Sequence, residues 1–212
     1  MKEDTIKTKN VILMVGFLFI AFFIFFLLIN ALSDNIQIDG NEQNLVEENY
    51  YLKILLKAQS ELSDGYVIAD EGIELYLLSQ YAYEDLDFVN SERYCFQART
   101  KFLITSQTFR EIKASLKEDK EYELIKLYSD MIEEQIIMYD NLYEACEHFE
   151  SASRYFDKYY NAGVSYNDAS YDMGSQEIEM ANEKIEAHDN AVKRHNDILA
   201  EYTLELEKML EI

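Results

Sequence analysis

The feature that most constrains this chain is an apolar run close to its N-terminus. Residues 11–32 read VILMVGFLFIAFFIFFLLINAL and contain no charged side chain. A helix of about 20 apolar residues is long enough to cross the ~30 Å hydrocarbon core of a bilayer. The run therefore predicts one transmembrane helix, with a short tail before it and most of the chain after it.

The charges on either side of this run predict its orientation. Lys2, Lys7 and Lys9 precede it, whereas the first cation after it is Lys53. Cytoplasmic flanks of transmembrane helices are enriched in Lys and Arg. We therefore expect residues 1–10 in the cytoplasm and the large C-terminal part outside, in a single-pass protein of the cell membrane.

The same run could instead be part of a secretory signal peptide. Ala31-Leu32-Ser33 has the small-x-small pattern of a cleavage site. The apolar region of a signal peptide usually has only ~7–15 residues, fewer than this run. We therefore expect a retained signal anchor over residues 11–32 rather than cleavage after Ser33.

The part after the run is strongly acidic. Residues 34–212 contain 16 Lys and Arg against 39 Asp and Glu, a net charge of −23. Nucleic-acid binding needs a basic footprint, which this composition excludes. Binding to anionic lipid head groups is unfavourable for the same electrostatic reason. An acidic surface can attract a basic protein partner, or can simply keep the helices soluble.

Apolar stripes with alternating spacings of three and four predict the fold class. This spacing is typical of helices that pack in bundles and coiled coils, and the chain contains no Pro to interrupt them. We expect an all-α protein: after the transmembrane helix and a linker over 33–44, a long antiparallel four-helix bundle over 45–212, coiled-coil-like in its packing. The expected helices are 45–84, 87–117, 120–162 and 175–211. The clearest stripe belongs to the second of these helices: Phe88, Ser91, Cys95, Ala98, Phe102, Thr105, Phe109, Ile112 and Leu116.

Asp64-Gly65 lies in the middle of the first expected helix. Such a dipeptide often marks a turn, but the apolar stripe continues through it without a change of phase. We therefore expect an uninterrupted helix, with Gly65 and Gly72 on its outer face. Each glycine would then cost up to ~1 kcal/mol relative to Ala.

The two cysteines, Cys95 and Cys146, fall on the stripes of adjacent antiparallel helices. Extracytoplasmic compartments are oxidising and permit disulfides, so the pair is a disulfide candidate. The alternative is two reduced thiols that fill small core positions, as free Cys commonly does. A redox enzyme would require Cys-x-x-Cys, which the sequence lacks.

Three side chains are weak candidates for a metal site. If the third and fourth helices fold about a loop centred near residue 168, His148 and His188 come level, and Glu144 lies one turn from His148. The set is faintly similar to the carboxylate and histidine sites of ferritin-like bundles, although it lacks their Glu-x-x-His pairs. We expect no cofactor. His188 and His195 more plausibly serve as buried polar residues that set the helix register, and their protonation near pH 6 would loosen the bundle.

The segment over residues 164–174, VSYNDASYDMG, is the longest one without a stripe after the linker. An up-down-up-down topology places it at the end of the bundle away from the membrane. Exposed tyrosines in such a loop predict a contact site. The candidate contact residues are Tyr166, Asn167, Asp168, Tyr171 and Asp172.

No catalytic motif is present: there is no Gly-rich phosphate loop, haem-attachment motif or specific Ser-His-Asp arrangement. We do not expect an enzyme. The first interpretation is an interaction protein, a scaffold or an accessory subunit of an envelope or membrane complex, with a protein partner or a second copy of itself. A second is a ligand sensor that signals through a partner, since a span followed by a helical bundle is similar in architecture to the external part of chemoreceptors and sensor kinases. A metal-binding bundle ranks third.

Overall fold

A computed structural model of the chain describes residues 42–116, 122–161 and 168–209. The chain divides into two units, residues 1–46 and residues 47–212. The predicted tail and span lie outside the described residues. So does the predicted linker, except for residues 42–44, which belong to the first described helix. No helix among those described is both long enough and apolar enough to span a membrane.

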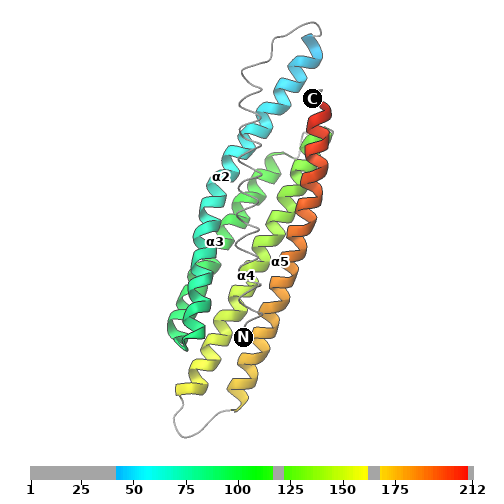
Figure 1. Ribbon diagram of the computed structural model, residues 1–212. Coiled ribbons are helices and arrows are strands. Elements are labelled where there is room, and N and C mark those ends of the chain that lie inside the picture. Colours follow the sequence, from blue (N-terminus) through cyan, green and yellow to red (C-terminus); the bar gives the residue numbers. More distant parts are fainter. Residues whose placement is uncertain (1–41, 117–121, 162–167, 210–212) are drawn as a thin grey trace. The chain divides into compact units, whose positions relative to one another are not determined.

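The described part of the chain consists of four helices. They are α2 (Glu42–Glu84), α3 (Phe88–Ser115), α4 (Glu123–Asn161) and α5 (Asp168–Met209). In the second unit they run alternately up and down and pack as a bundle (Figure 1). The prediction of an all-helical four-helix bundle is confirmed for these residues.

The apolar side chains at the positions from Phe88 to Leu116 that the spacing identified form a large share of the bundle core. All nine stripe positions from Phe88 to Leu116 are buried, and Phe102 and Phe109 have no exposed surface. Buried Ser and Thr side chains alternate with the aromatic rings along this helix, and Ser91 Oγ lies 2.9 Å from Ser153 Oγ of α4. The stripe identified in the sequence is therefore the face on which α3 packs against its neighbours.

The helix α2 continues through Asp64-Gly65 without a break, as its stripe predicted. The expectation that Gly65 and Gly72 face outward was wrong, because both are buried against α3. A Cβ atom at Gly65 would lie 2.4 Å from Phe109 Cε1, and one at Gly72 would lie 2.8 Å from Phe102 Cε1. The two glycines thus leave the space that the α3 phenylalanine rings fill.

The turn between α2 and α3 falls between the helices expected over 45–84 and 87–117, in the acidic segment over residues 84–87. Leu86 adopts a left-handed backbone conformation with φ 61°, a position where Gly is commonest. Its N–H donates to the Tyr83 carbonyl at 3.0 Å. Asp87 caps α3 by accepting a hydrogen bond from the Asn90 N–H at 3.2 Å, a preferred arrangement at helix N-termini.

The helix α5 begins at Asp168, earlier than the start near Ser175 expected from the sequence. The residues before Ser175 lack an apolar stripe, yet they pack closely against α4. The Tyr171 and Phe156 ring centroids are 5.5 Å apart, and a Cβ atom at Gly174 would lie 2.8 Å from the Phe156 ring. The first turns of α5 therefore pack against α4, although no apolar pattern in the sequence indicated that the helix begins there.

Candidate functional site

Aromatic rings from all four helices meet at the end of the bundle where α2 and α4 finish and α3 and α5 begin (Figure 1). Phe88 of α3 lies at the centre, 5.4 Å from Tyr83, 5.9 Å from Phe156 and 5.5 Å from Tyr160 between ring centroids. Tyr171 of α5 packs against Phe156. These distances are typical of favourable aromatic pairs. We call this set the aromatic end: Tyr83, Phe88, Phe156, Tyr160 and Tyr171.

The aromatic end combines a buried centre with an exposed rim. Phe88 and Phe156 are buried, whereas Tyr160 and Tyr171 are exposed. Burial, followed by the proximity of Tyr160 and Tyr171, raises the pKa of Tyr83 to about 12, so its hydroxyl stays neutral. Further large apolar side chains are exposed close by in the sequence: Tyr81, Leu86, Val89 and Met173. Gathered exposed apolar side chains are typical of interaction sites.

Only part of the contact loop predicted from the sequence falls within the described residues. Tyr166 and Asn167 lie outside them, and Asp168 is the first residue of α5. Tyr171 and Asp172 are exposed, but on the first turn of this helix rather than in a loop. The other residues of the aromatic end were not among the candidates, although Phe88 was recognised as a stripe position.

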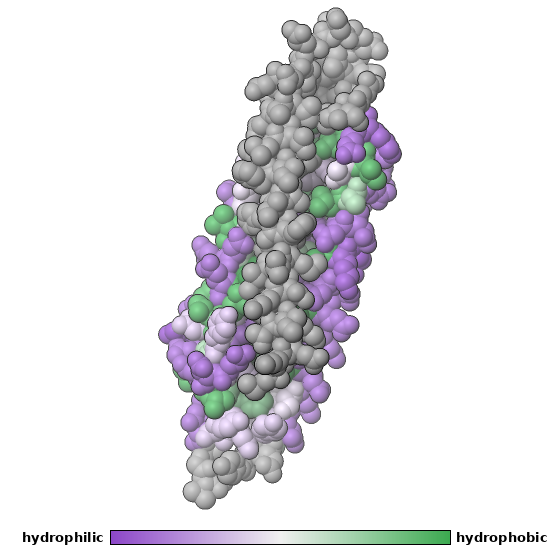
Figure 2. Space-filling model, in the orientation of Figure 1, coloured by the Kyte–Doolittle hydropathy of each residue, from purple (hydrophilic) through white to green (hydrophobic). Residues whose placement is uncertain are grey.

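The described residues present a mostly polar surface on one face of the molecule. On the face shown in Figure 2, hydrophilic side chains predominate and hydrophobic ones form separate patches. This distribution is consistent with the strong acidity of the sequence. Because the surrounding surface is polar, apolar side chains that are exposed at one end of the bundle indicate a site of contact with another molecule.

The three weak metal candidates do not come together. Glu144 forms an ion pair with Lys184. His148 Nδ1 lies 2.8 Å from Glu177 Oε2, and His188 Nδ1 lies 3.1 Å from Asp189 Oδ1. Within the described helices, no three His, Cys, Asp or Glu side chains form a group that could hold a metal ion.

The register of α4 and α5 explains why His148 and His188 are not level. The expectation assumed that these helices fold about residue 168, but α5 already begins there. His148 consequently faces Glu177, near the start of α5, instead of His188 further along. The metal set thus depended on a register that the two helices do not adopt.

Cys95 and Cys146 are both buried, with free thiols in the structure. Cys95 donates a hydrogen bond to Ser79 Oγ at 3.1 Å, and the two thiols also hydrogen-bond to each other. Burial, then the contact with Cys95, raises the pKa of the Cys146 thiol well above its usual range. The disulfide and the pair of reduced core thiols both stay predictions, which alkylation can distinguish.

We expect both thiols to be inert in the folded chain. Neither side chain has exposed surface, so a reagent in solvent does not reach the thiols while the bundle is folded. Iodoacetamide at about pH 7.5 should leave Cys95 and Cys146 unmodified in the native protein and should alkylate both in urea without reductant, as measured by mass spectrometry. Alkylation in urea only after reduction would instead reveal a disulfide.

A layer of buried polar side chains crosses the middle of the bundle. The Gln135 side-chain N–H₂ of α4 donates to the Tyr66 hydroxyl of α2 and to His195 Nε2 of α5, the latter at 2.9 Å. His195 and His188 are both buried, as expected from their stripe positions. Since Gln135 joins two other helices through directional bonds, the layer can fix the helix register.

The layer predicts a pH dependence of stability. Burial lowers the pKa of His195, and the neighbouring Asn196 and Glu134 only partly oppose this effect. Below the ordinary histidine pKa of ~6.5, the unfolded chain therefore binds a proton more readily than the folded bundle does. The contribution of His195 to stability is complete above this pH and is lost as the pH falls.

A paired variant isolates this effect from the titration of the many carboxylates. The free energy of unfolding of the wild-type chain minus that of His195→Gln should decrease from about pH 8 to about pH 5, as measured by urea denaturation. The neutral Gln side chain removes the histidine titration and leaves the other charged groups in place. A difference that does not change with pH would contradict the prediction.

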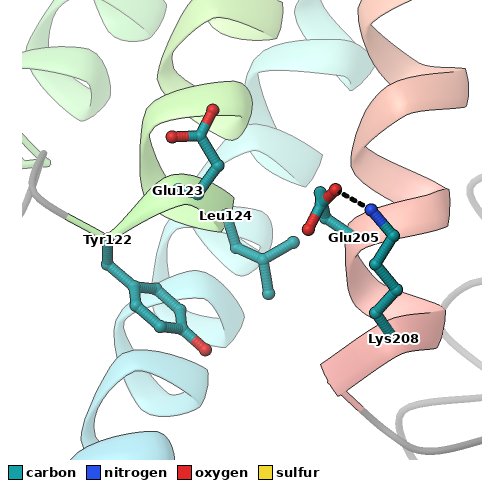
Figure 3. A pocket seen from close by; sticks show the side chains of 5 residues that line it. All are labelled: Tyr122, Glu123, Leu124, Glu205 and Lys208. Carbon is teal, nitrogen blue, oxygen red and sulfur yellow. Dashed lines mark hydrogen bonds and ion pairs between the residues drawn. The ribbon is translucent and has the colours of Figure 1, made fainter.

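A small hollow lies near the other end of the second unit, between the start of α4 and the end of α5 (Figure 3). It has a volume of about 280 Å³ and is lined by Tyr122, Glu123, Leu124, Glu205 and Lys208. Lys208 forms an ion pair with Glu205, and Lys126 Nζ lies 3.1 Å from Glu123 Oε1. The volume is below the ~300–1,000 Å³ typical of ligand pockets, and both carboxylates already have cationic partners.

The strongest candidate site is therefore a surface for contacts rather than a pocket for chemistry. Comparisons with models of protein families, with curated proteins and with solved structures find no match to this chain. The assignment of a function consequently depends on the chain's own sequence and on the aromatic end.

Proposed function

We propose that this chain is a single-pass membrane protein whose extracytoplasmic bundle binds a protein partner, as a scaffold or an accessory subunit of an envelope or membrane complex. The observation that carries the proposal is the aromatic end, where exposed tyrosines from α4 and α5 surround a buried aromatic centre. Interface cores are enriched in aromatic residues, with Tyr among the commonest binding hot spots.

The position of the aromatic end along α2 supports this role. The chain enters α2 from the segment that contains the predicted span, and Tyr83 lies at the opposite end of this helix. At 1.5 Å per residue, the 43 residues of α2 extend over about 65 Å. A helix of this length can present the aromatic end to a partner well beyond the lipid head groups.

Acidic side chains beside the aromatic end indicate the chemistry of the partner. Glu84, Asp85 and Asp87 in the α2–α3 turn are exposed, as is Asp172 in α5. Protein interfaces commonly combine an apolar core with a charged rim, and complementary charge accelerates association. The partner surface should therefore have an apolar centre surrounded by Lys or Arg.

Membrane attachment can be tested separately from partner binding. The full chain should stay in the membrane pellet after an alkaline carbonate wash, and protease added to the outside of intact cells should digest the bundle. A tag on the N-terminus should remain protected. Release of the chain by the wash would contradict anchoring.

Site-specific photo-crosslinking tests the contact surface. A benzophenone side chain at position 160 or 171 of the full chain, in its own membrane, should crosslink to one heterologous protein. The matched control is position 204, an exposed residue near the opposite end of α5. Equal crosslinking from all three positions, or none from the two tyrosine positions, would contradict the proposed role of the aromatic end.

A further inference from the structure

The charge of α3 differs in sign from that of the other helices. Each of α2, α4 and α5 has more acidic than basic residues, whereas α3 has a net charge of +3. The α3 cations are Arg93, Arg99, Lys101, Arg110 and Lys113, and its acidic residues are Glu92 and Glu111.

Most of these cations pair with the helices on either side of α3. Lys101 Nζ lies 2.5 Å from Glu71 Oε2 of α2, and Arg99 Nη1 lies 3.4 Å from Glu147 Oε1 of α4. Arg110 and Lys113 form ion pairs with two further carboxylates of α4, Asp140 and Glu133. These pairs offset acidic charge along both edges of α3, so its outer face lacks the acidic excess of the rest of the bundle.

That outer face carries a row of exposed apolar side chains, which we call the α3 stripe: Val89, Phe96 and Leu103. They recur at intervals of seven, and each side chain is between 39% and 64% exposed. A regular apolar row on a helix is typical of a surface that packs against another helix.

We propose that the α3 stripe is the interface between two copies of this chain, packed in parallel about a two-fold axis. Two chains of net charge −22 repel each other, and the outer face of α3 permits close approach with the least repulsion. The parallel orientation rests on the proposed membrane anchor, because two copies in one membrane are related by an axis along the membrane normal. Each stripe residue then meets its equivalent in the partner subunit, as an isologous interface requires.

The residues beside the α3 stripe are compatible with this packing. If Val89, Phe96 and Leu103 are the d positions of a heptad, Glu92 and Arg99 are g positions, and each faces the e position five residues later in the partner. Glu92 then faces Gln97 of the partner subunit, and Arg99 faces Ile104 of the partner subunit. Neither of these pairs opposes like charges. Arg93 falls on an a position, where it meets Arg93 of the partner subunit, and Glu92 of the partner subunit lies beside it with the opposite charge.

Cysteine crosslinking in the full-length, membrane-embedded chain tests both the interface and its direction. The variants V89C, F96C and L103C place a thiol on the α3 stripe, while Cys95 and Cys146 are buried. Treated with a short bis-maleimide, each variant alone should form a product of twice the chain mass. The control L204C replaces an equally exposed apolar side chain, 58% exposed, on α5, and should stay monomeric.

Each other outcome overturns the proposal. Crosslinking of V89C only to L103C would show an antiparallel pair, and products with a different protein would show another occupant of the face. Absence of products from all three variants, or equal products from L204C, would exclude this interface. Failure of the anchor is distinguishable, since it appears in the carbonate wash and does not depend on these thiols.

Discussion

Replacing Arg99 with Met is expected to lower the free energy of unfolding by about 1–3 kcal/mol. Glu150 of α4 is only 3% exposed, and its Oε2 lies 3.4 Å from Arg99 Nη1. When the guanidinium is removed, Glu150 Oε2 loses the positive charge that lies nearest to it. The remaining partner, Arg154, contacts the other oxygen from a half-exposed position. The measurement is urea denaturation of the full chain in detergent, followed by circular dichroism.

Two further variants show whether the loss of stability comes from the missing contact between Arg99 and Glu150. Arg93→Met removes an exposed guanidinium from the same helix and should change stability by less than about 0.5 kcal/mol. The double variant Arg99→Met with Glu150→Met should recover most of the stability, since apolar side chains can replace a buried ion pair. Equal losses from Arg93→Met and Arg99→Met, or no recovery in the double variant, would contradict this explanation.

The second large effect is expected at Gly65. Substitution by Ala should lower the free energy of unfolding by about 1–3 kcal/mol, because the added methyl overpacks the α2–α3 contact. The new Cβ atom would lie 2.4 Å from Phe109 Cε1, so the ring or the helix must move. An exposed helical glycine would show the opposite sign, with a gain of up to ~1 kcal/mol from Ala.

The nearby variant Ser63→Ala is the control for helix propensity. Ser63 is exposed on the same helix, so Ala should be neutral or slightly stabilising there. Combining Gly65→Ala with Phe109→Leu should relieve part of the steric conflict, which a double-mutant cycle of thermal unfolding would detect as coupling. A stabilising effect of Gly65→Ala alone would show that the glycine faces solvent.

The sequence predicted those parts of the fold that depend on residues close together in the chain. The stripe from Phe88 to Leu116 predicted the buried face of α3, because spacings of three and four place side chains on one side of a helix. The helix bounds expected from the sequence, 45–84 and 87–117, likewise predicted the turn before Phe88. The start of α5 was not predictable in this way, since its first turns pack through Tyr171 and Gly174 against Phe156 and have no stripe of their own.

The candidate sites depended on contacts between helices, and there the sequence was less informative. Cys95 and Cys146 lie on adjacent helices, as the sequence predicted, and both are buried there. His148 and His188 required a register of α4 and α5 that the helices do not adopt. The aromatic end was missed because the meeting of its residues at one end of the bundle depends on the topology.

The sequence by itself determined that the described chain forms long amphipathic helices that pack in a bundle, and it supplied the predicted span and the acidic surface. These properties follow from periodicity, hydrophobicity and charge, which act along one segment. Only the tertiary structure showed that the phenylalanine rings of α3 pack against the glycines of α2, and that Gln135 forms hydrogen bonds to both Tyr66 and His195. It also showed which apolar residues remain exposed on α3 and at the aromatic end. Each of these depends on how one helix is rotated and shifted against another, because a side chain's environment is set by helices far away in the sequence.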